Sequence, residues 1–142
     1  MVIPLKNQWG KITSLQFVNE TGEKRFLSSG KKQNSFFQIG FIKEGQSIII
    51  CEGFATGSTL NKYLNIPTVC AIDSGNLIPV AEKLAKRYPS TQFIIGADND
   101  HFTVINGVKV NVGLKKADEL KAIFKNSIIR YPQFPSEYID RH

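Results

Sequence analysis

Residues 47–60 read Ser-Ile-Ile-Ile-Cys-Glu-Gly-Phe-Ala-Thr-Gly-Ser-Thr-Leu, and this stretch decides the fold. Its first five residues form a short, almost continuous apolar run, which is typical of a strand covered on both faces of a sheet. Residues 56–64, which follow it closely, have the periodicity of a helix. A buried strand that leads into a helix is the repeating unit of a parallel sheet, so this segment predicts an α/β fold.

The same alternation of buried strand and helix continues to residue 131 and predicts a parallel sheet flanked by helices. We expect strands at residues 47–51, 68–72, 92–97 and 128–131, and helices at residues 56–64, 77–88 and 112–125. Asn76 is the expected N-cap of the second helix, with Pro79 in its first turn. Residues 46–131 are therefore expected to form a Rossmann-like α/β core.

The N-terminal residues 1–45 have a different pattern, which predicts a small antiparallel β segment. Residues 12–18 alternate between apolar and polar side chains, residues 19–22 favour a turn, and residues 24–27 resume an extended run. This reads as a hairpin, and residues 36–39 are expected to add a third strand. Residues 132–142, rich in proline and charge, are interpreted as a C-terminal extension.

Length and composition point to one domain. The chain has 142 residues, of which 42% are hydrophobic, enough for a single core. It has neither a stretch long enough to span a bilayer nor a signal-peptide pattern, so we expect a cytoplasmic protein with no membrane partner. Cys51 and Cys70 lie in apolar runs and are expected to be buried, reduced thiols; a nucleophilic role for Cys51 would need a base, and no histidine lies near it in sequence.

The charge favours a polyanionic partner. The 18 basic and 12 acidic residues give a net charge of +6 and a pI near 9.4, which promotes nucleic-acid binding through counterion release. The basic residues are scattered, so a solvated surface is the alternative interpretation. Lys115 and Lys116 are candidates for contacts with single-stranded DNA.

Acidic residues follow three successive predicted strands. Glu52 follows the first, Asp73 the second, and Asp98 and Asp100 the third. Because the carboxyl ends of parallel strands meet at one edge, where ligands bind, these carboxylates are expected to gather there. Asp98 and Asp100 are two residues apart, so in a strand they point the same way and could share a Mg²⁺ or Mn²⁺ ion. A surface turn is the alternative for Asp-Asn-Asp.

The junction after Glu52 could also receive a phosphate. Gly53 allows close backbone approach, and the amides of Thr56 and Gly57 open the following helix. Alternatively, Glu52 is a helix-start carboxylate that favours the helix dipole. The sequence contains neither a dinucleotide-binding fingerprint nor a P-loop, which argues against those two enzyme classes.

Four ordered motifs, together with residues 22–27 of the hairpin, resemble a known family. They are Glu-Gly-Phe-Ala-Thr-Gly-Ser-Thr-Leu at 52–60, Ala-Ile-Asp-Ser-Gly-Asn-Leu at 71–77, Asp-Asn-Asp at 98–100, and Asn-Val-Gly-Leu-Lys-Lys-Ala at 111–117. Over roughly residues 12–125 the chain resembles the Toprim domain of plasmid conjugative primases and phage primase-helicases.

The resemblance implies a role for each matching residue. Asp98 and Asp100 would bind Mg²⁺, and Glu52 would be the acid/base or a further metal ligand. The implied contacts with nucleic acid or phosphate are Gly53, Thr56, Gly57, Asn76 and Lys116. Asp73 could instead stabilise the turn at Gly75 and Asn76, and His101 is interpreted as a solvent-facing side chain.

The implied function is nucleotidyl transfer in primer synthesis on single-stranded DNA during plasmid or phage replication. Nucleoside triphosphates would be the substrates, and a helicase domain or protein a further partner. The chain in isolation is expected to make primers poorly, because holding the template needs additional elements. The alternatives are a Toprim nuclease that uses water as nucleophile, a non-catalytic module that binds metal and nucleic acid, and a flavodoxin-like domain without metal affinity.

Overall fold

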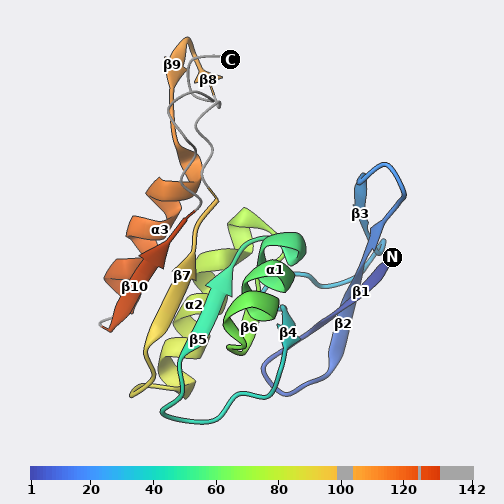
Figure 1. Ribbon diagram of the computed structural model, residues 1–142. Coiled ribbons are helices and arrows are strands. Elements are labelled where there is room, and N and C mark those ends of the chain that lie inside the picture. Colours follow the sequence, from blue (N-terminus) through green and yellow to red (C-terminus); the bar gives the residue numbers. More distant parts are fainter. Residues whose placement is uncertain (99–103, 125, 132–142) are drawn as a thin grey trace.

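A computed structural model gives the structure of the protein, and it describes residues 1–98, 104–124 and 126–131. Figure 1 shows a mixed α/β fold with a separate small sheet at its N-terminus. The strands are β1 (Val2–Lys6), β2 (Ile12–Val18), β3 (Lys24–Phe26), β4 (Phe37–Ile39), β5 (Ile48–Cys51), β6 (Thr68–Cys70), β7 (Phe93–Gly96), β8 (Val104–Ile105), β9 (Val108–Lys109) and β10 (Ser127–Arg130). The helices are α1 (Phe54–Leu64), α2 (Ser74–Arg87) and α3 (Val112–Ile123).

The main sheet has five strands in the order β10-β7-β5-β6-β4. The four strands other than β4 run parallel, and β4 pairs antiparallel with β6 at one edge. The central strand β5 is paired on both sides, with Cys51 opposite Gly96 of β7 and opposite Cys70 of β6. The predicted parallel α/β sheet is confirmed, with each strand within two residues of its expected bounds.

Helices cover both faces of this sheet, which is why its three inner strands β5, β6 and β7 are almost entirely buried. Ile48 and Ile50 belong to the core cluster that contains the buried side chains of α2 and α3. Cys51 belongs to a second cluster on the opposite face, where Phe54 of α1 packs. In Figure 1, α1 lies in front of the sheet and α2 behind it.

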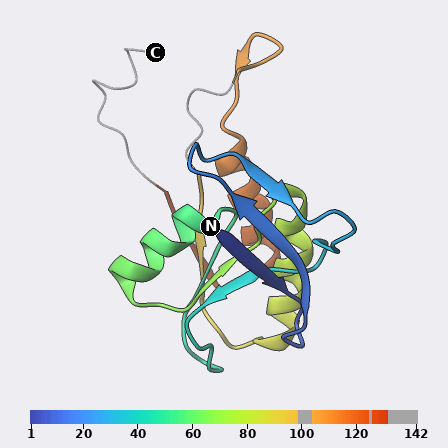
Figure 2. The ribbon, with the colours of Figure 1, turned by 90° about the vertical axis from the view of Figure 1, so that its right-hand side faces the viewer.

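The N-terminal sheet has the order β1-β2-β3 and is antiparallel. The predicted β2-β3 hairpin is confirmed, but of the expected third strand at residues 36–39 only Phe36 pairs with this sheet, through an isolated antiparallel bridge to Lys6 of β1. The residues after it form β4, which pairs with the open edge of β6 in the main sheet. The third strand is instead β1, which the sequence analysis missed; its Pro4 suits an edge strand, because proline has no amide to donate. The N-terminal sheet lies beside β4, as seen in Figures 1 and 2.

The beginning of α2 also differs from the prediction. The helix starts at Ser74, and its N-cap is Asp73, whose side chain accepts a hydrogen bond from the Gly75 amide. Asn76 was expected as the N-cap but lies inside the first turn, three per cent exposed. Asp73 is the N-cap instead, because its carboxylate accepts a hydrogen bond from a free amide of the first turn. No helix in the described part of the chain is long and apolar enough to cross a membrane.

Candidate active site

Glu52 and Asp98 follow the two neighbouring parallel strands β5 and β7, which end level with each other at Cys51 and Gly96. Both carboxylates line one small hollow, and Lys116 of α3 lines it too. Three residues from three separate sequence motifs therefore line one hollow at the carboxyl end of the sheet. Paired carboxylates can hold a divalent metal ion, and a lysine can bind a phosphate as a point charge.

The first turn of α1 positions the carboxylate of Asp98. The hydroxyl of Thr56 donates a hydrogen bond to Oδ1 of Asp98 over 3.0 Å. Thr56 is the third residue of α1, which begins after the extended N-cap Gly53. The motif that follows Glu52 thus holds the acidic residue that follows β7.

Gly57 is required for packing at this junction. It is buried, and a Cβ at this position would lie 2.9 Å from Sγ of Cys51 and even closer to Sγ of Cys70. Its amide donates to the carbonyl of Gly53 over 3.0 Å, as the first hydrogen bond of the helix. The amide of Gly57 is therefore engaged within α1, and we assign it this structural role rather than the phosphate contact expected from the sequence.

The start of α3 completes the hollow. Asn111 caps the helix by accepting from the amide of Leu114 over 3.1 Å. At Gly113 an added Cβ would overlap the backbone carbonyl of Asp98, so only glycine lets the helix approach so closely. One turn later, Lys116 reaches the hollow with about a third of its side chain exposed, and its Nζ lies 3.4 Å from the carboxylate of Glu119. The motif at residues 111–117 is thus explained by three roles: Asn111 caps the helix, Gly113 allows the close approach to Asp98, and Lys116 brings a cation to the hollow.

Backbone strain occurs next to Glu52. Ile72, which follows β6, has a φ of +72°, although β-branched residues rarely adopt this conformation. In this conformation its amide donates to the carbonyl of Glu52 over 2.6 Å. The side chain of Ile72 is buried in the second core cluster. Nothing in the sequence signalled this feature.

The two cysteines are buried and free, as expected. The Sγ atoms of Cys51 and Cys70 lie 3.8 Å apart. The hydrogen bond to Cys70 and burial raise the pKa of Cys51 strongly, and the charges of Asp98 and Glu52 raise it further. The thiol is therefore neutral at physiological pH, which argues against a nucleophilic role.

The third acidic residue of the rim has a structural partner. Asp73 forms an ion pair with Lys32, with Nζ and Oδ2 2.6 Å apart. This hydrogen bond to the Lys32 ammonium, reinforced by the Gly75 amide, lowers the pKa of Asp73. Asp73 therefore connects the start of α2 to the N-terminal segment.

Asn76 connects the same two parts of the molecule. Its side-chain amide donates to the carbonyls of Lys32, Ser35 and Ala71, and its carbonyl accepts from the amide of Asn34. A buried amide with its donors and its acceptor engaged in this way is a structural anchor. We assign Asn76 that role in place of the phosphate contact that the sequence resemblance implied.

Asp100 and His101 lie outside the described residues. Among the residues that the structure describes, no group of three or more acidic, histidine or cysteine side chains is arranged to hold a metal ion. The described part of the predicted metal site is therefore the pair Glu52 and Asp98. An oxygen-only pair of this kind fits Mg²⁺, which takes one or two carboxylates from the protein and its other ligands from water and phosphate.

Two solved structures share this fold. The primase fragment of the bacteriophage T7 primase-helicase protein has the same fold, with a TM-score of 0.61, 16% identity, and 94% of this chain and 53% of that one covered. A primase-domain complex of bacteriophage T7 lagging-strand DNA polymerase, with an RNA/DNA hybrid and dTTP, contains a similar chain: TM-score 0.61, 17% identity, 94% and 65% covered.

Sequence similarity leads to particular relatives. The chain is 36% identical over 131 residues to a DNA primase TraC of Escherichia coli, covering 86% of this chain and 12% of that protein. A second DNA primase TraC of Escherichia coli is 34% identical over 120 residues, with 82% and 8% covered. No protein-family model matches. The chain is thus similar to a short segment of DNA primases, and it spans about a tenth of their length.

Proposed function

We propose that this chain is the Toprim-type catalytic domain of a DNA primase and that it performs nucleotidyl transfer in primer synthesis on single-stranded DNA. The observation that supports this best is the convergence of Glu52, Asp98 and Lys116 on one hollow at the carboxyl end of the parallel sheet. The sequence similarity to DNA primases and the shared fold with a primase fragment agree with it.

Asp98 and Asp100 would hold Mg²⁺ or Mn²⁺, and Glu52 would be the acid/base or a further ligand of the ion. When bound, the ion would neutralise the charge that develops on the transferring phosphoryl group. Thr56 would keep the Asp98 carboxylate in place through its 3.0 Å hydrogen bond. The amides of the first residues of α1 precede the first helical hydrogen bond, so they remain candidates for a phosphate contact.

In the proposed reaction the 3′-oxygen of a primer nucleotide forms a bond to the α-phosphorus of a nucleoside triphosphate, and pyrophosphate leaves. Glu52 would accept the proton that the 3′-hydroxyl loses. Lys116 lines the same hollow and would bind the phosphates of the incoming nucleotide as a point charge. The residues of this chain would thus bind, orient and deprotonate the reactants.

The partners of the reaction are part of the proposal. Single-stranded DNA would be the template and nucleoside triphosphates the substrates, and a helicase domain or protein would act alongside, as the T7 primase-helicase relative suggests. The setting we propose is plasmid or phage replication in the cytoplasm.

A primer-extension assay tests this function. Because the primer is already annealed to its template, the protein does not have to assemble them. The protein is incubated with a labelled RNA primer annealed to a DNA template, nucleoside triphosphates and Mg²⁺ or Mn²⁺, and the products are separated on a denaturing gel. We expect longer products from the wild-type chain, and a loss of about 100-fold or more in Glu52→Gln and Asp98→Asn. Glu82→Gln, which changes an exposed carboxylate on α2, is the matched control and should extend normally.

The assay also separates the alternatives. Shortening of the labelled strand that depends on Glu52 would identify a nuclease, with water in place of the 3′-hydroxyl. Neither extension nor shortening by a folded protein that binds Mn²⁺ would identify a non-catalytic module. Either result would overturn the proposal.

A further inference from the structure

A second pocket, with a volume of about 700 Å³, lies away from the carboxylate rim. It is formed by the turn between β1 and β2, by β4 and the loop after it, and by the last turn of α2. Helix α2 leaves the carboxyl end of the sheet at Asp73, so its last turn lies at the opposite end. Leu77 lines the candidate active site, whereas Leu84, two turns further on, lines this pocket.

The charged side chains that line this pocket are all basic. They are Lys6, Lys83 and Arg87, and no acidic residue lines it. None of the three forms a salt bridge among the described residues. Three cations without carboxylate partners create a local field that attracts a polyanion.

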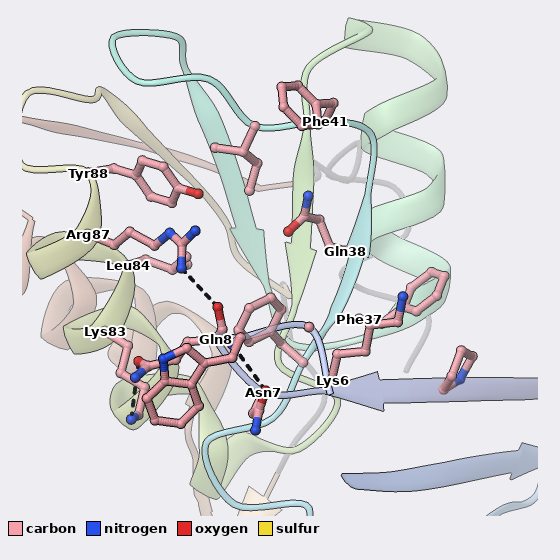
Figure 3. A pocket seen from close by; sticks show the side chains of 15 residues that line it. Lys6, Asn7, Gln8, Phe37, Gln38, Phe41, Lys83, Leu84, Arg87 and Tyr88 are labelled. Carbon is pink, nitrogen blue, oxygen red and sulfur yellow. Dashed lines mark hydrogen bonds between the residues drawn. The ribbon is translucent and has the colours of Figure 1, made fainter. Parts of the chain in front are cut away.

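Two of these cations are held in position. Arg87 donates to the backbone carbonyl of Gln8 over 2.9 Å, and Nζ of Lys83 lies 3.5 Å from Oε1 of the same residue. Figure 3 shows both contacts as dashed lines at one side of the pocket. Lys83 and Arg87 are four residues apart on α2 and therefore share one face of the helix. A guanidinium has five N–H donors, so Arg87 keeps donors for a phosphate.

Aromatic side chains lie beside the cations. Trp9 is 77% exposed and Phe41 is 76% exposed, and Tyr88 also lines the pocket. In Figure 3, Phe41 and Tyr88 lie on the side of the pocket above Arg87. Exposed aromatic faces beside cations are the usual elements of sites for single-stranded nucleic acid, in which bases stack and phosphates pair with lysine or arginine.

Hydrogen bonds to the side chain of Asn7 hold the turn that carries Trp9. Oδ1 of Asn7 accepts from the amide of Trp9 over 3.0 Å and from that of Lys11 over 3.1 Å. Gly10 has a φ of +80°, a conformation that other residues rarely adopt. The large exposed indole is therefore carried on a hydrogen-bonded turn, so less backbone entropy is lost when a base stacks on it.

We infer that this pocket binds a segment of single-stranded nucleic acid, with bases on Trp9 and its aromatic neighbours and phosphates on Lys83, Arg87 and Lys6. The site would give the protein a second hold on a strand, at the other end of the sheet from the active site. The inference goes beyond the proposed function and does not require the catalytic carboxylates. A volume of about 700 Å³ is sufficient for one or two nucleotides.

Intrinsic fluorescence tests the inference directly, because Trp9 is the one tryptophan in the chain. Oligo(dT) is titrated into the protein in EDTA, which removes any contribution from a bound metal. We expect saturable quenching that weakens as salt rises, with a slope of log K against log[salt] of about −2 for three phosphate contacts. The Lys83→Gln/Arg87→Gln double variant should bind roughly tenfold or more weakly, with a slope of about −0.7.

Two further variants make the result specific. Lys24→Gln/Lys31→Gln removes two exposed charges outside the pocket and serves as the charge-matched control for the double variant, with affinity and slope unchanged. Trp9→Ala should weaken the binding of a fluorescently labelled oligo(dT), followed by anisotropy, roughly tenfold. Glu52→Gln should quench like the wild type, which separates this site from the active site.

The inference fails if oligo(dT) at low salt leaves the Trp9 fluorescence unchanged. That result would favour a protein as the partner of this pocket. It also fails if the double variant binds as the wild type does. In both cases the primer-extension result stands independently, because that assay depends on Glu52 and Asp98.

Discussion

The hydroxyl of Thr56 lies 3.0 Å from Oδ1 of Asp98 and joins the first turn of α1 to the end of β7. Thr56 follows Glu52 by four residues, so the element that begins after one acidic residue fixes the orientation of the other. A carboxylate oxygen that accepts a hydrogen bond keeps its remaining lone pairs for other ligands.

Replacing Thr56 by valine is therefore expected to weaken metal binding while leaving the fold intact. Removing a hydrogen bond that orients a metal-binding carboxylate typically lowers metal affinity by about 10- to 100-fold. Titration with Mn²⁺, followed by electron paramagnetic resonance, measures the change. Thr56→Ser keeps the hydroxyl and should restore the affinity. Equal affinities of the valine variant and the wild type would show that Asp98 does not depend on this contact.

Gly113 should tolerate no side chain. An added Cβ would overlap the Asp98 carbonyl, which is backbone and cannot rotate away. Gly113→Ala is thus expected to cost about 1–3 kcal/mol, although alanine in a helix interior normally stabilises by up to about 1 kcal/mol. Chemical denaturation measures the free energy of unfolding.

Gly75→Ala in α2 is the matched control for Gly113→Ala. There the nearest atom to an added Cβ is Oδ1 of Asp73 at 3.1 Å, in a side chain that can adjust. The control should lose clearly less stability. A Gly113→Ala variant as stable as the wild type would contradict the close approach of α3 to Asp98.

The parallel sheet could be predicted because the inner strands, such as β5 and β7, are apolar on both faces, and few other folds need that pattern. The position of β4 could not. Phe37 and Ile39 read equally well as a strand of either sheet, and only the open edge of β6 decides which sheet they join. Local patterns specify strands, whereas pairing depends on contacts that are distant in sequence.

The candidate site was predictable to a similar degree. The convergence of Glu52 and Asp98 followed from strand ends, because parallel strands deliver their last residues to one edge. The role of Asn76 did not follow, since its four partners come from residues 32–35 and from Ala71. A short polar residue at a helix start reads the same whether it caps the helix or anchors a distant loop.

The Asp73–Lys32 ion pair should stabilise the folded protein only at pH values at which Asp73 is ionised. The pKa of Asp73 is lowered below its ordinary value of 3.8, so this pair stabilises the folded state above that pH. Its contribution is lost as the pH falls below 3.8 through the lowered pKa, where folded and unfolded states are both protonated. Because the two side chains are 29% and 45% exposed, solvent screening limits the effect to about 1 kcal/mol or less.

Asp73→Asn tests this dependence, because asparagine keeps the helix cap and removes only the charge. Its free energy of unfolding should be lower than that of the wild type at pH 7 and should converge on it as the pH falls below 3.8 through the lowered pKa of Asp73. A difference that stays constant across this range would show that the charge pair makes no contribution and that the cap alone is affected.

Ile72 is expected to invert the usual order of glycine and alanine. At most positions glycine is the less stable of the two, because its unfolded chain has more freedom. At Ile72, with a φ of +72°, alanine keeps the steric strain and glycine relieves about 1–2 kcal/mol of it. Both variants lose a buried side chain, at a cost of about 2–5 kcal/mol, so both should be less stable than the wild type. Thermal unfolding of the pair should nevertheless show Ile72→Gly melting above Ile72→Ala.

The same comparison bears on the site, because the strained amide donates to the carbonyl of Glu52 over 2.6 Å. An alanine variant that is as stable as the glycine variant, or more stable, would contradict this prediction. It would show that residue 72 can relax to an ordinary φ, with loss of the hydrogen bond to Glu52, and that the strained conformation is not needed to hold Glu52.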